Sequence, residues 1–427
     1  MSFDLDTIRA QFPALAITDE NVPRIYFDNP AGTQVPSGVV DAVRRCLVET
    51  NANVQGGFAT SMAADAIVSG VHEAMADMLN AASPDEIVFG QNMTTLTLYM
   101  SRSIGRTLRK GDEIVLSRMD HDANVGPWLL LARDLELEVR WLPFNTDTYE
   151  FDPDALDNVL SDRTRLVCVG AASNLIGTIN DVKSMCAKAR AAGALTFIDA
   201  VQAVPHIPID VQDIGCDFLA CSAYKFFGPH QGILWGRHEL LSSLEPYKVR
   251  PAPDTVPGCF ETGTQSHEGM AGTTAAVDYF AWVGETMAGD HAKAPDDSRN
   301  RTRAVHAALD CLFEYETALA EHLIGGLQEL PGVRVRGITD NGAMHRRVPT
   351  VAFTVDGAVP EVIAAELAAR NIFVWSGHNY AIEAARHMGI YDAGGAVRVG
   401  PVHYNSPAEI DTLLNALEDI IPRARAA

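Results

Sequence analysis

The fold of this 427-residue chain is decided by the stretch LTFIDAVQ, residues 195–202. Its apolar beginning predicts a buried strand that ends at Asp199. A second apolar run, residues 218–221, leads in the same way to SAYK, residues 222–225. We therefore expect Asp199 and Lys225 to lie at the carboxyl ends of neighbouring strands.

A carboxylate and a lysine in this arrangement suit pyridoxal 5'-phosphate (PLP). The Lys225 amine would form an imine with the cofactor aldehyde, and Asp199 would keep the pyridine nitrogen protonated. The aromatic neighbours of Lys225 favour burial, which lowers the pKa of a lysine and makes it nucleophilic. As an alternative, Asp199 caps a helix and Gln202 completes a capping box. In the functional interpretation, Gln202 contacts the phenolic oxygen of the cofactor.

Composition excludes several classes of function. The net charge of −22 argues against nucleic acids and anionic membranes as partners. The seven cysteines have irregular spacing, so we expect most to be buried thiols in a reducing cytoplasm. No metal-ligand spacing, signal peptide or apolar run of membrane-spanning length is present in the sequence.

Apolar runs alternate with helical patterns between residues 60 and 240, which predicts an α/β fold. Because the runs lack polar alternation, we expect a mainly parallel sheet of seven strands with both faces covered. The predicted strands are Glu86–Phe89, Glu113–Ser117, Glu138–Leu142, Leu166–Val169, Leu195–Asp199, Phe218–Cys221 and Gly232–Trp235. A helix is predicted over Val182–Ala192, before Gly193. Ligands of such sheets bind beyond the carboxyl ends of the strands.

The rest of the chain predicts a smaller α+β domain. A long helical pattern spans residues 297–330 and is followed by four strand patterns and two helices. The expected elements are Val333–Val335, Thr350–Thr354, Pro360–Arg370, Ile372–Trp375, Val397–Val399 and Pro407–Ile421. The predicted organisation is a segment 1–25 that packs near the small domain, a large domain 26–290 and a small domain 291–427.

Further candidate residues follow other strands. Met93 and Thr94 open a helix whose N-terminus would favour a phosphate, although the threonine could be a simple cap. Ser222 is a second phosphate candidate. His121 would stack on the pyridine ring and move protons, unless it is a surface residue.

Two more candidates lie further along the chain. Asn174 would place an amide near the ring. Arg398, inside an apolar run, is suited to clamp a substrate α-carboxylate with two hydrogen bonds.

Together these residues resemble the class V aminotransferase family of PLP enzymes, fold type I. The nearest branch is that of the cysteine desulfurases and selenocysteine lyases. The matching segments run almost end to end: YFDNPAG (26–32), PDEIVF (84–89), DHDAN (120–124), SNLIGT (173–178), DAVQAV (199–204), SAYK (222–225) and FETGT (260–264).

The resemblance implies further roles. Thr264 would reach the phosphate site of a neighbouring subunit, which implies a homodimer. Tyr224 stands where the family has a histidine, and it changes a phosphate contact. Substrate contacts are implied for Asn29, Ala31, His378, Tyr380 and Arg398.

The loop SGHNYA (376–381) resembles the desulfurase loop that carries the sulfur-accepting cysteine, with Tyr380 in the place of that cysteine. A desulfurase needs a thiolate there to carry a persulfide. We therefore predict a PLP enzyme that acts on a small α-amino acid by carbon–sulfur or carbon–selenium lysis, without a persulfide cysteine. Transamination, epimerisation with His121 or Tyr380 as second base, and a non-catalytic PLP-binding protein are the alternatives.

Overall fold

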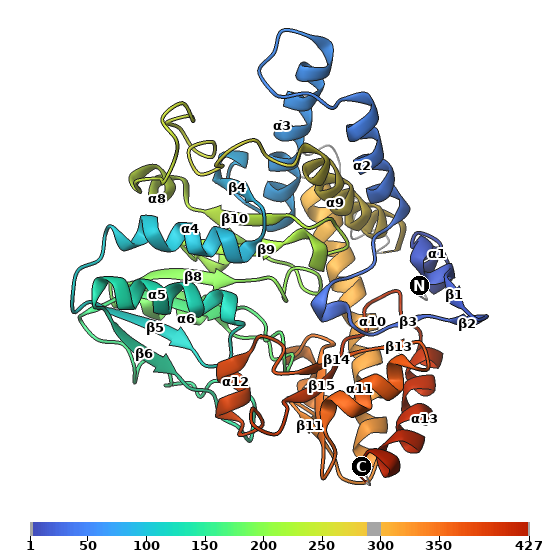
Figure 1. The fold of residues 1–427 in the computed structure, drawn as a ribbon. Coiled ribbons are helices and arrows are strands. Elements are labelled where there is room, and N and C mark those ends of the chain that lie inside the picture. Colours follow the sequence, from blue (N-terminus) through green and yellow to red (C-terminus); the bar gives the residue numbers. More distant parts are fainter. Residues whose placement is uncertain (1–2, 288–299, 426–427) are drawn as a thin grey trace.

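A computed structural model describes residues 3–287 and 300–425 (Figure 1). The larger part of the chain holds the helices α1 (Leu5–Arg9), α2 (Ser37–Glu49), α3 (Ala59–Leu79), α4 (Met93–Gly105), α5 (Gly126–Leu135), α6 (Val182–Ala191), α7 (Val211–Ile214), α8 (His238–Ser243) and α9 (His267–Met287). The remaining helices are α10 (Asn300–Glu329), α11 (Pro360–Ala368), α12 (Ile382–His387) and α13 (Pro407–Ala424).

A seven-stranded sheet forms the centre of the larger part. Its strands, in spatial order, are β4 (Ile87–Gly90), β10 (Gly232–Gly236), β9 (Phe218–Ser222), β8 (Leu195–Asp199), β7 (Thr164–Gly170), β5 (Glu113–Ser117) and β6 (Glu138–Leu142). Strand β10 is antiparallel to both of its neighbours, and all other pairs are parallel. The predicted mainly parallel α/β fold is confirmed.

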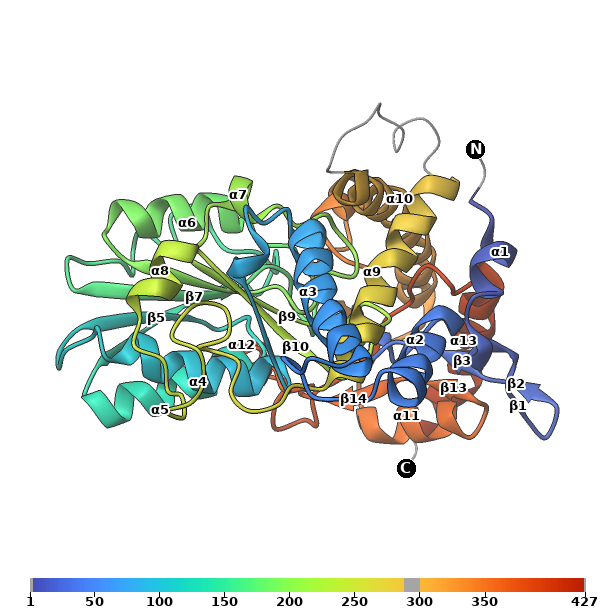
Figure 2. The ribbon, with the colours of Figure 1, turned by 90° about the horizontal axis from the view of Figure 1, so that it is seen from above.

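Helices cover both faces of this sheet (Figure 2). Helices α4 and α5 lie together on one face, and α6 and α7 lie on the other. The central strands β5, β8 and β9 are almost entirely buried, because both of their faces pack against helices. Helix α6 ends one residue earlier than predicted, and Gly193 follows it with a φ of +77°, which glycine adopts without strain.

The smaller part contains a four-stranded antiparallel sheet in the order β11 (Val333–Arg336), β12 (Val351–Val355), β15 (Ala396–Val399) and β14 (Trp375–Gly377). The single strand predicted over residues 372–375 is wrong. The chain divides there, because β13 (Ile372–Phe373) pairs with β3 (Ile25–Tyr26), whereas β14 pairs with β15. Residues 297–299 of the predicted long helix, and the predicted domain boundary at residue 290, lie outside the described residues.

The long helix α10 belongs to two hydrophobic cores. Leu309 and Leu312 pack with the core beside the seven-stranded sheet. Leu319 and Leu323 pack with the core of the four-stranded sheet. The helix therefore runs from one core to the other (Figure 1).

The beginning of the chain contacts this second core. Strands β1 (Thr18–Asp19) and β2 (Val22–Pro23) form a short hairpin that leads into β3. Ile25 is paired with Ile372 in the parallel β3–β13 ladder. Arg9 Nη1 lies 3.0 Å from a carboxylate oxygen of Glu409 in α13. Within residues 3–287 and 300–425, no helix is long and apolar enough to cross a membrane.

Candidate active site

A cavity of about 1170 Å³ lies beyond the carboxyl ends of the parallel strands. The large sheet contributes Asp199 and Ser222, which end β8 and β9. The smaller part contributes the loop 375–380 and Arg398 from β15. The cavity is thus lined by both parts of the molecule, where the sequence predicts a ligand site.

Asp199 and Lys225 both line this cavity. Strands β8 and β9 are adjacent and parallel, with Asp199 paired to Ala220, so their ends meet at one edge of the sheet. Lys225 lies in the turn that follows β9, and its Nζ donates a hydrogen bond to the carbonyl oxygen of Pro30. The nitrogen also lies 4.7 Å from the ring centroid of Tyr224.

The alternative role of Asp199 in a capping box is wrong. Its carboxylate accepts a hydrogen bond from the Val201 N–H at 2.9 Å, but residues 201–206 form turns rather than a helix. The side chain of Gln202 instead contacts Thr350 and His206. The backbone near Asp199 thus fixes one carboxylate oxygen, and the carboxylate lies on the cavity wall.

The surroundings change the proton affinity of both groups. Burial, aided by Arg398, lowers the pKa of Lys225 to about 7, although Asp199 and Asp28 oppose the shift. Burial raises the pKa of Asp199 to about 6, against the opposing effect of the Val201 N–H and of Lys225. About half of a lysine with this pKa is a neutral amine at pH 7, and only the neutral form is nucleophilic.

His121 lies on the cavity wall, stacked against Tyr380. The two ring centroids are 5.4 Å apart, with an angle of 22° between the planes. The Nδ1 atom of His121 accepts a hydrogen bond from the Ala123 N–H, and burial with nearby Lys225 and Arg398 lowers the pKa of His121 to about 3. The ring is therefore neutral at physiological pH and presents a flat aromatic face.

The N-terminus of α4 opens onto the cavity. Asn92 caps the helix by accepting a hydrogen bond from the Thr95 N–H at 2.8 Å, and Met93 and Thr94 line the cavity. Free backbone N–H groups and the helix dipole at this end favour an anion. Ser222 and Tyr224 lie on the same wall, and the Tyr224 ring stacks on His230 at 5.0 Å. This end of the cavity is suited to a phosphate.

Arg398 and Asn174 carry buried polar atoms that the protein leaves unused. The Nη1 of Arg398 donates to the carbonyl oxygen of Asn174 at 2.8 Å, and the Asn174 Nδ2 donates to the carbonyl oxygen of Asn379 at 2.7 Å. Arg398 Nε and Asn174 Oδ1 are buried and have no partner among the described residues. Buried polar atoms are normally paired, so both atoms indicate a polar ligand at this point.

Most of the predicted site residues are brought together by the fold. Those on the cavity wall are Ala31, Met93, Thr94, His121, Asn174, Asp199, Gln202, Ser222, Tyr224, Lys225, His378, Tyr380 and Arg398. Two lie elsewhere. Asn29 is buried behind the wall, where its amide contacts Tyr26, Gly400, Tyr404 and Asn405. Thr264 is exposed and does not line the cavity of its own chain.

Several residues of the cavity have no counterpart among the sites predicted from the sequence. Leu98, Leu130 and Trp375 form an apolar rim together with Tyr380. The exposed fractions of Trp375 and Tyr380 are 52% and 67%, unusual for aromatic side chains. A sequence signal exists only for Leu98 and Leu130, which break the amphipathic patterns of α4 and α5.

No cysteine is among the described residues that line the cavity. Cys259, which directly precedes the matching segment FETGT, is buried beside Phe260 in the core that contains β9 and β10. Burial raises the pKa of the Cys259 thiol. The residue at the loop position that resembles the persulfide site is Tyr380, which lines the cavity.

The lining residues fit PLP. The nucleophilic amine of Lys225, the carboxylate of Asp199 and the flat ring of His121 are the groups that the aldehyde, the pyridine nitrogen and the ring face require. The N-terminus of α4 provides a phosphate site at the other end. Arg398 Nε and Asn174 Oδ1 are buried without a partner among the described residues, so both atoms can bind a polar ligand beside the cofactor.

Comparison with known proteins agrees with this chemistry. Residues 25–299 and 306–413 match the model of the family described as aminotransferase class-V. A cysteine desulfurase of Pectobacterium atrosepticum is 31% identical over 98% of both chains, and one of Yersinia pestis is 30% identical over 98% of this chain and 99% of its own.

Solved structures agree as well. The apo structure of the cysteine desulfurase from Thermococcus onnurineus covers 99% of both chains, with a TM-score of 0.86 and 27% identity. The cysteine desulfurase CsdA from Escherichia coli covers 99% of this chain and 100% of its own, with a TM-score of 0.83 and 26% identity.

Proposed function

Because this chain belongs to the class V aminotransferase family and is a PLP-dependent, cysteine desulfurase-like enzyme, we propose a specific reaction for it. The substrate is a small α-amino acid with sulfur or selenium on its β-carbon, and the reaction is β-elimination. The observation that carries this proposal is a cavity with Lys225, Asp199 and Arg398 on its wall and Tyr380, rather than cysteine, in the loop that faces them.

Each of four residues of the cavity has a separate role in this reaction. When bound, PLP supplies an electron sink for negative charge at the substrate α-carbon. Arg398 binds and orients the α-carboxylate, with its free Nε as an additional donor. Lys225 Nζ takes the proton from the α-carbon, and Asp199 holds a proton at the ring nitrogen. The neutral ring of His121 would lie against one face of the cofactor ring and would exclude water from it.

Elimination differs from desulfuration in its demands on the protein. Desulfuration requires a thiolate that attacks the substrate sulfur and takes it as a persulfide, which leaves alanine. In elimination, the bond between the β-carbon and sulfur breaks, and the sulfur leaves with the bonding electron pair and takes up the proton that Lys225 removed from the α-carbon. The leaving group is hydrogen sulfide from cysteine, hydrogen selenide from selenocysteine and a thiol from an S-alkyl cysteine. Hydrolysis of the remaining unsaturated amine with one water gives pyruvate and ammonia. The absence of cysteine from the described cavity wall supports this second route.

The test is product analysis with the purified, cofactor-loaded enzyme. Cysteine, selenocysteine and S-alkyl cysteines are supplied singly, and pyruvate, alanine, thiol and ammonia are measured. Equal amounts of pyruvate, ammonia and the leaving group (sulfide, selenide or thiol, according to the substrate) are expected, with no alanine. Alanine with protein-bound persulfide would contradict the proposal, as would an α-keto acid that retains the side chain, or a D-amino acid. A Lys225→Ala variant is the control for reaction outside the site.

We also propose that the enzyme is a homodimer in which Thr264 contacts the phosphate bound in the neighbouring subunit. Thr264 lies in an exposed loop outside the cavity of its own chain, which supports a contact across a subunit interface. No nucleic acid or membrane partner is proposed. Residence in a reducing cytoplasm remains a prediction from the sequence.

A further inference from the structure

A chain of buried polar side chains leads away from the cavity at Gln202. The amide Nε2 of Gln202 lies 3.0 Å from Thr350 Oγ1 and 3.2 Å from His206 Nε2. On the far side of the imidazole, His206 Nδ1 lies 2.7 Å from Glu316 Oε2. Gln202 and His206 are each 3% exposed, and Glu316 is 0% exposed. Nothing in the proposed reaction uses His206 or Glu316.

Glu316 occupies an unexpected place for a carboxylate. It lies on α10 between Leu312, which belongs to one hydrophobic core, and Leu319, which belongs to the other. Isolated buried charges are costly, so an acid at this point requires partners of opposite charge or several hydrogen bonds. Burial raises the pKa of Glu316, but His206 and His403 outweigh it and hold that pKa below its usual value. Glu316 is therefore a buried anion.

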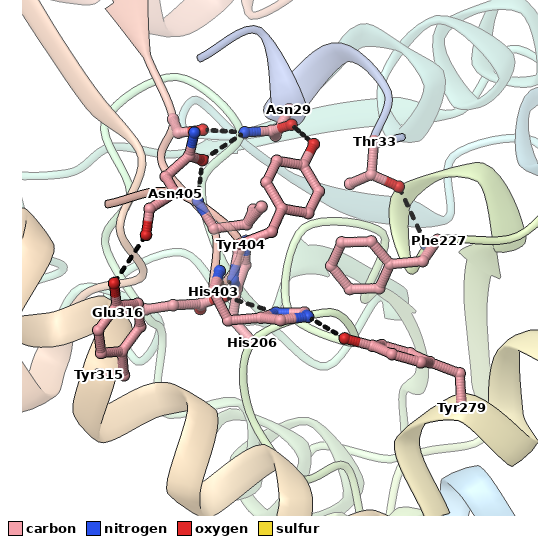
Figure 3. A network of polar contacts seen from close by, with 12 residues as sticks. Asn29, Thr33, His206, Phe227, Tyr279, Tyr315, Glu316, His403, Tyr404 and Asn405 are labelled. Atoms are coloured by element: carbon pink, nitrogen blue, oxygen red, sulfur yellow. Dashed lines mark hydrogen bonds and ion pairs between the residues drawn. The ribbon is translucent and has the colours of Figure 1, made fainter. Parts of the chain in front are cut away.

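His403 does not supply the positive charge. Glu316 Oε1 accepts from the backbone N–H of His403 at 2.9 Å and lies 3.3 Å from His403 Nδ1. At the other side of this ring, the Nε2 atom lies 2.8 Å from the hydroxyl of Tyr279 (Figure 3). Burial lowers the pKa of His403, so its ring is neutral, and the neighbouring Glu316 oxygen places the single ring proton on Nδ1. Nε2 then accepts from the Tyr279 hydroxyl, which stays protonated because burial raises its pKa far above its usual value.

His206 is the other buried imidazole that faces Glu316, and its Nδ1 lies 2.7 Å from a carboxylate oxygen, which is ion-pair geometry. Both of its ring nitrogens face hydrogen-bonding groups, Glu316 on one side and the amide of Gln202 on the other. An imidazolium donates from both nitrogens, and its Nε2–H then requires an acceptor. The two ends of a carboxamide have nearly the same shape, and the surrounding network decides which end faces which partner. An imidazolium at His206 selects the amide oxygen of Gln202.

We propose that Glu316 holds His206 as an imidazolium, and that His206 thereby turns the Gln202 amide so that its N–H groups face the phenolic oxygen of the cofactor. The amide oxygen then accepts from His206 Nε2–H and from the Thr350 hydroxyl. A phenolic oxygen that carries negative charge needs a donor, and an amide oxygen in its place would repel it. His206 and Glu316 are positioning residues, and their role rests on the assignment of Gln202 to the phenolic oxygen, not on the elimination reaction.

The protonation of His206 is tested without cofactor. Full-length apoenzyme labelled with ¹⁵N at histidine is studied by NMR at pH 7, and the His206 signals are identified by their loss in His206→Gln. Both ring nitrogens of His206 are expected to carry protons, and Glu316→Gln is expected to remove the proton from one of them. A wild-type His206 with one bare nitrogen overturns the proposal, whatever reaction the enzyme catalyses.

The orientation of Gln202 is tested with the cofactor-loaded protein. The readout is the midpoint pH at which the visible absorbance of the cofactor joined to Lys225 changes. Loss of the N–H donor makes the phenolic oxygen more basic, so that it holds the proton on the adjacent Lys225 nitrogen more firmly. Glu316→Gln is expected to raise the midpoint by about one pH unit, since a hydrogen bond to a charged group contributes on this scale. Gln202→Leu is expected to raise it equally.

Two comparisons separate positioning from general stability. Tyr279→Phe removes a buried hydroxyl of the same network without altering the Glu316–His206–Gln202 path, so the midpoint is expected to stay unchanged. In a Gln202→Leu background, Glu316→Gln is expected to add no further shift. A shift with Tyr279→Phe equal to that with Glu316→Gln, or an additive shift in the double variant, overturns the proposal.

A milder variant covers the case in which Glu316→Gln does not fold. Thr350→Val keeps the shape of the side chain but removes the hydroxyl that donates to the amide oxygen of Gln202. It is expected to move the midpoint upward by a smaller amount than Gln202→Leu. An unchanged or lowered midpoint in Thr350→Val counts against the proposed orientation of the amide.

Discussion

Tyr380 covers His121, with ring centroids 5.4 Å apart and planes inclined by 22°. The two side chains come from opposite parts of the molecule, since His121 follows β5 and Tyr380 lies between β14 and α12. The backbone holds the pair in place as well, because the Asp122 N–H donates to the Tyr380 carbonyl oxygen at 2.7 Å. The large sheet and the loop from the smaller part therefore meet at one wall of the cavity.

This contact predicts different effects for two substitutions of Tyr380. Tyr380→Phe keeps the ring, so kcat/KM is expected to change less than about threefold. Tyr380→Ala removes an aromatic contact of about 1 kcal/mol, so kcat/KM is expected to fall roughly 5- to 10-fold. Steady-state assays of pyruvate formation measure both. If Tyr380→Phe were inactive, the Tyr380 hydroxyl would take part in the reaction, and a role limited to packing of the ring would be refuted.

The lowered pKa of Lys225 predicts how cofactor attachment depends on pH. Only the neutral amine attacks the aldehyde, and the pKa of about 7 makes half of Lys225 neutral near pH 7. The attachment rate is expected to fall about tenfold per unit below pH 7 and to level off above it. Stopped-flow absorbance of apoenzyme mixed with PLP measures this rate. A rate that keeps rising to pH 10 would indicate a lysine with an ordinary pKa.

Asp199→Asn is expected to reduce kcat by about 10²- to 10³-fold, because a neutral amide cannot hold a proton on the pyridine nitrogen. Lys225 remains, so the cofactor should still attach and its visible absorbance should persist. Asp199→Glu keeps the negative charge and is the matched control, with a smaller expected loss. Equal kcat values for Asp199→Asn and the unaltered enzyme would rule out this carboxylate as the ring partner.

Arg398→Lys is expected to raise KM about 10- to 100-fold with a smaller change in kcat. A lysine retains charge but cannot form the two parallel hydrogen bonds of a guanidinium, and a hydrogen bond to a charged group is worth about 1.5–3 kcal/mol. The measurement is the substrate dependence of pyruvate formation. A control with a substrate amide, which lacks the carboxylate charge, should show little difference between the two enzymes. Equal KM values for the carboxylate substrate would refute the clamp.

The proposed intersubunit contact of Thr264 is tested by mixing subunits. Lys225→Ala and Thr264→Ala homodimers are each expected to have low activity. In a mixed dimer, one cavity combines a normal Lys225 with a normal Thr264 from the other subunit. Unfolding and refolding the two variants together should therefore restore up to about one quarter of the wild-type activity, since half of the dimers are mixed and half of their sites are intact. No recovery, despite mixed dimers on gel filtration of tagged subunits, would place Thr264 outside the neighbouring site.

The sequence predicted the large sheet well because its strands are buried on both faces. Buried five-residue strands with a largely apolar sequence, such as those ending at Ser117 and Asp199, leave little freedom in register or length. Because the strand ends were predicted, the positions of the cavity residues that follow them were predicted as well. The break between β13 and β14 was not predictable, since residues 372–375 look alike and only their partners, β3 and β15, separate them.

Other features depend on distant contacts that no local pattern reveals. Gln202 has the spacing of a capping box, but its amide contacts Thr350, 148 positions later. Glu316 looks like an ordinary polar residue of an amphipathic helix, and only the positions of His206 and His403 show that it is buried. The rim of Leu98, Leu130 and Trp375 is similarly an outcome of packing between the two parts.

Because β3 forms its ladder with β13, residues 25 and 26 are synthesised some 350 residues before the strand with which they pair. During that interval the hairpin and Ile25 have no sheet to join. Assembly of the second core should thus be a late event in biogenesis, and loss of the β1–β2 hairpin and β3 should leave nascent chains prone to aggregate even though the larger sheet is already formed.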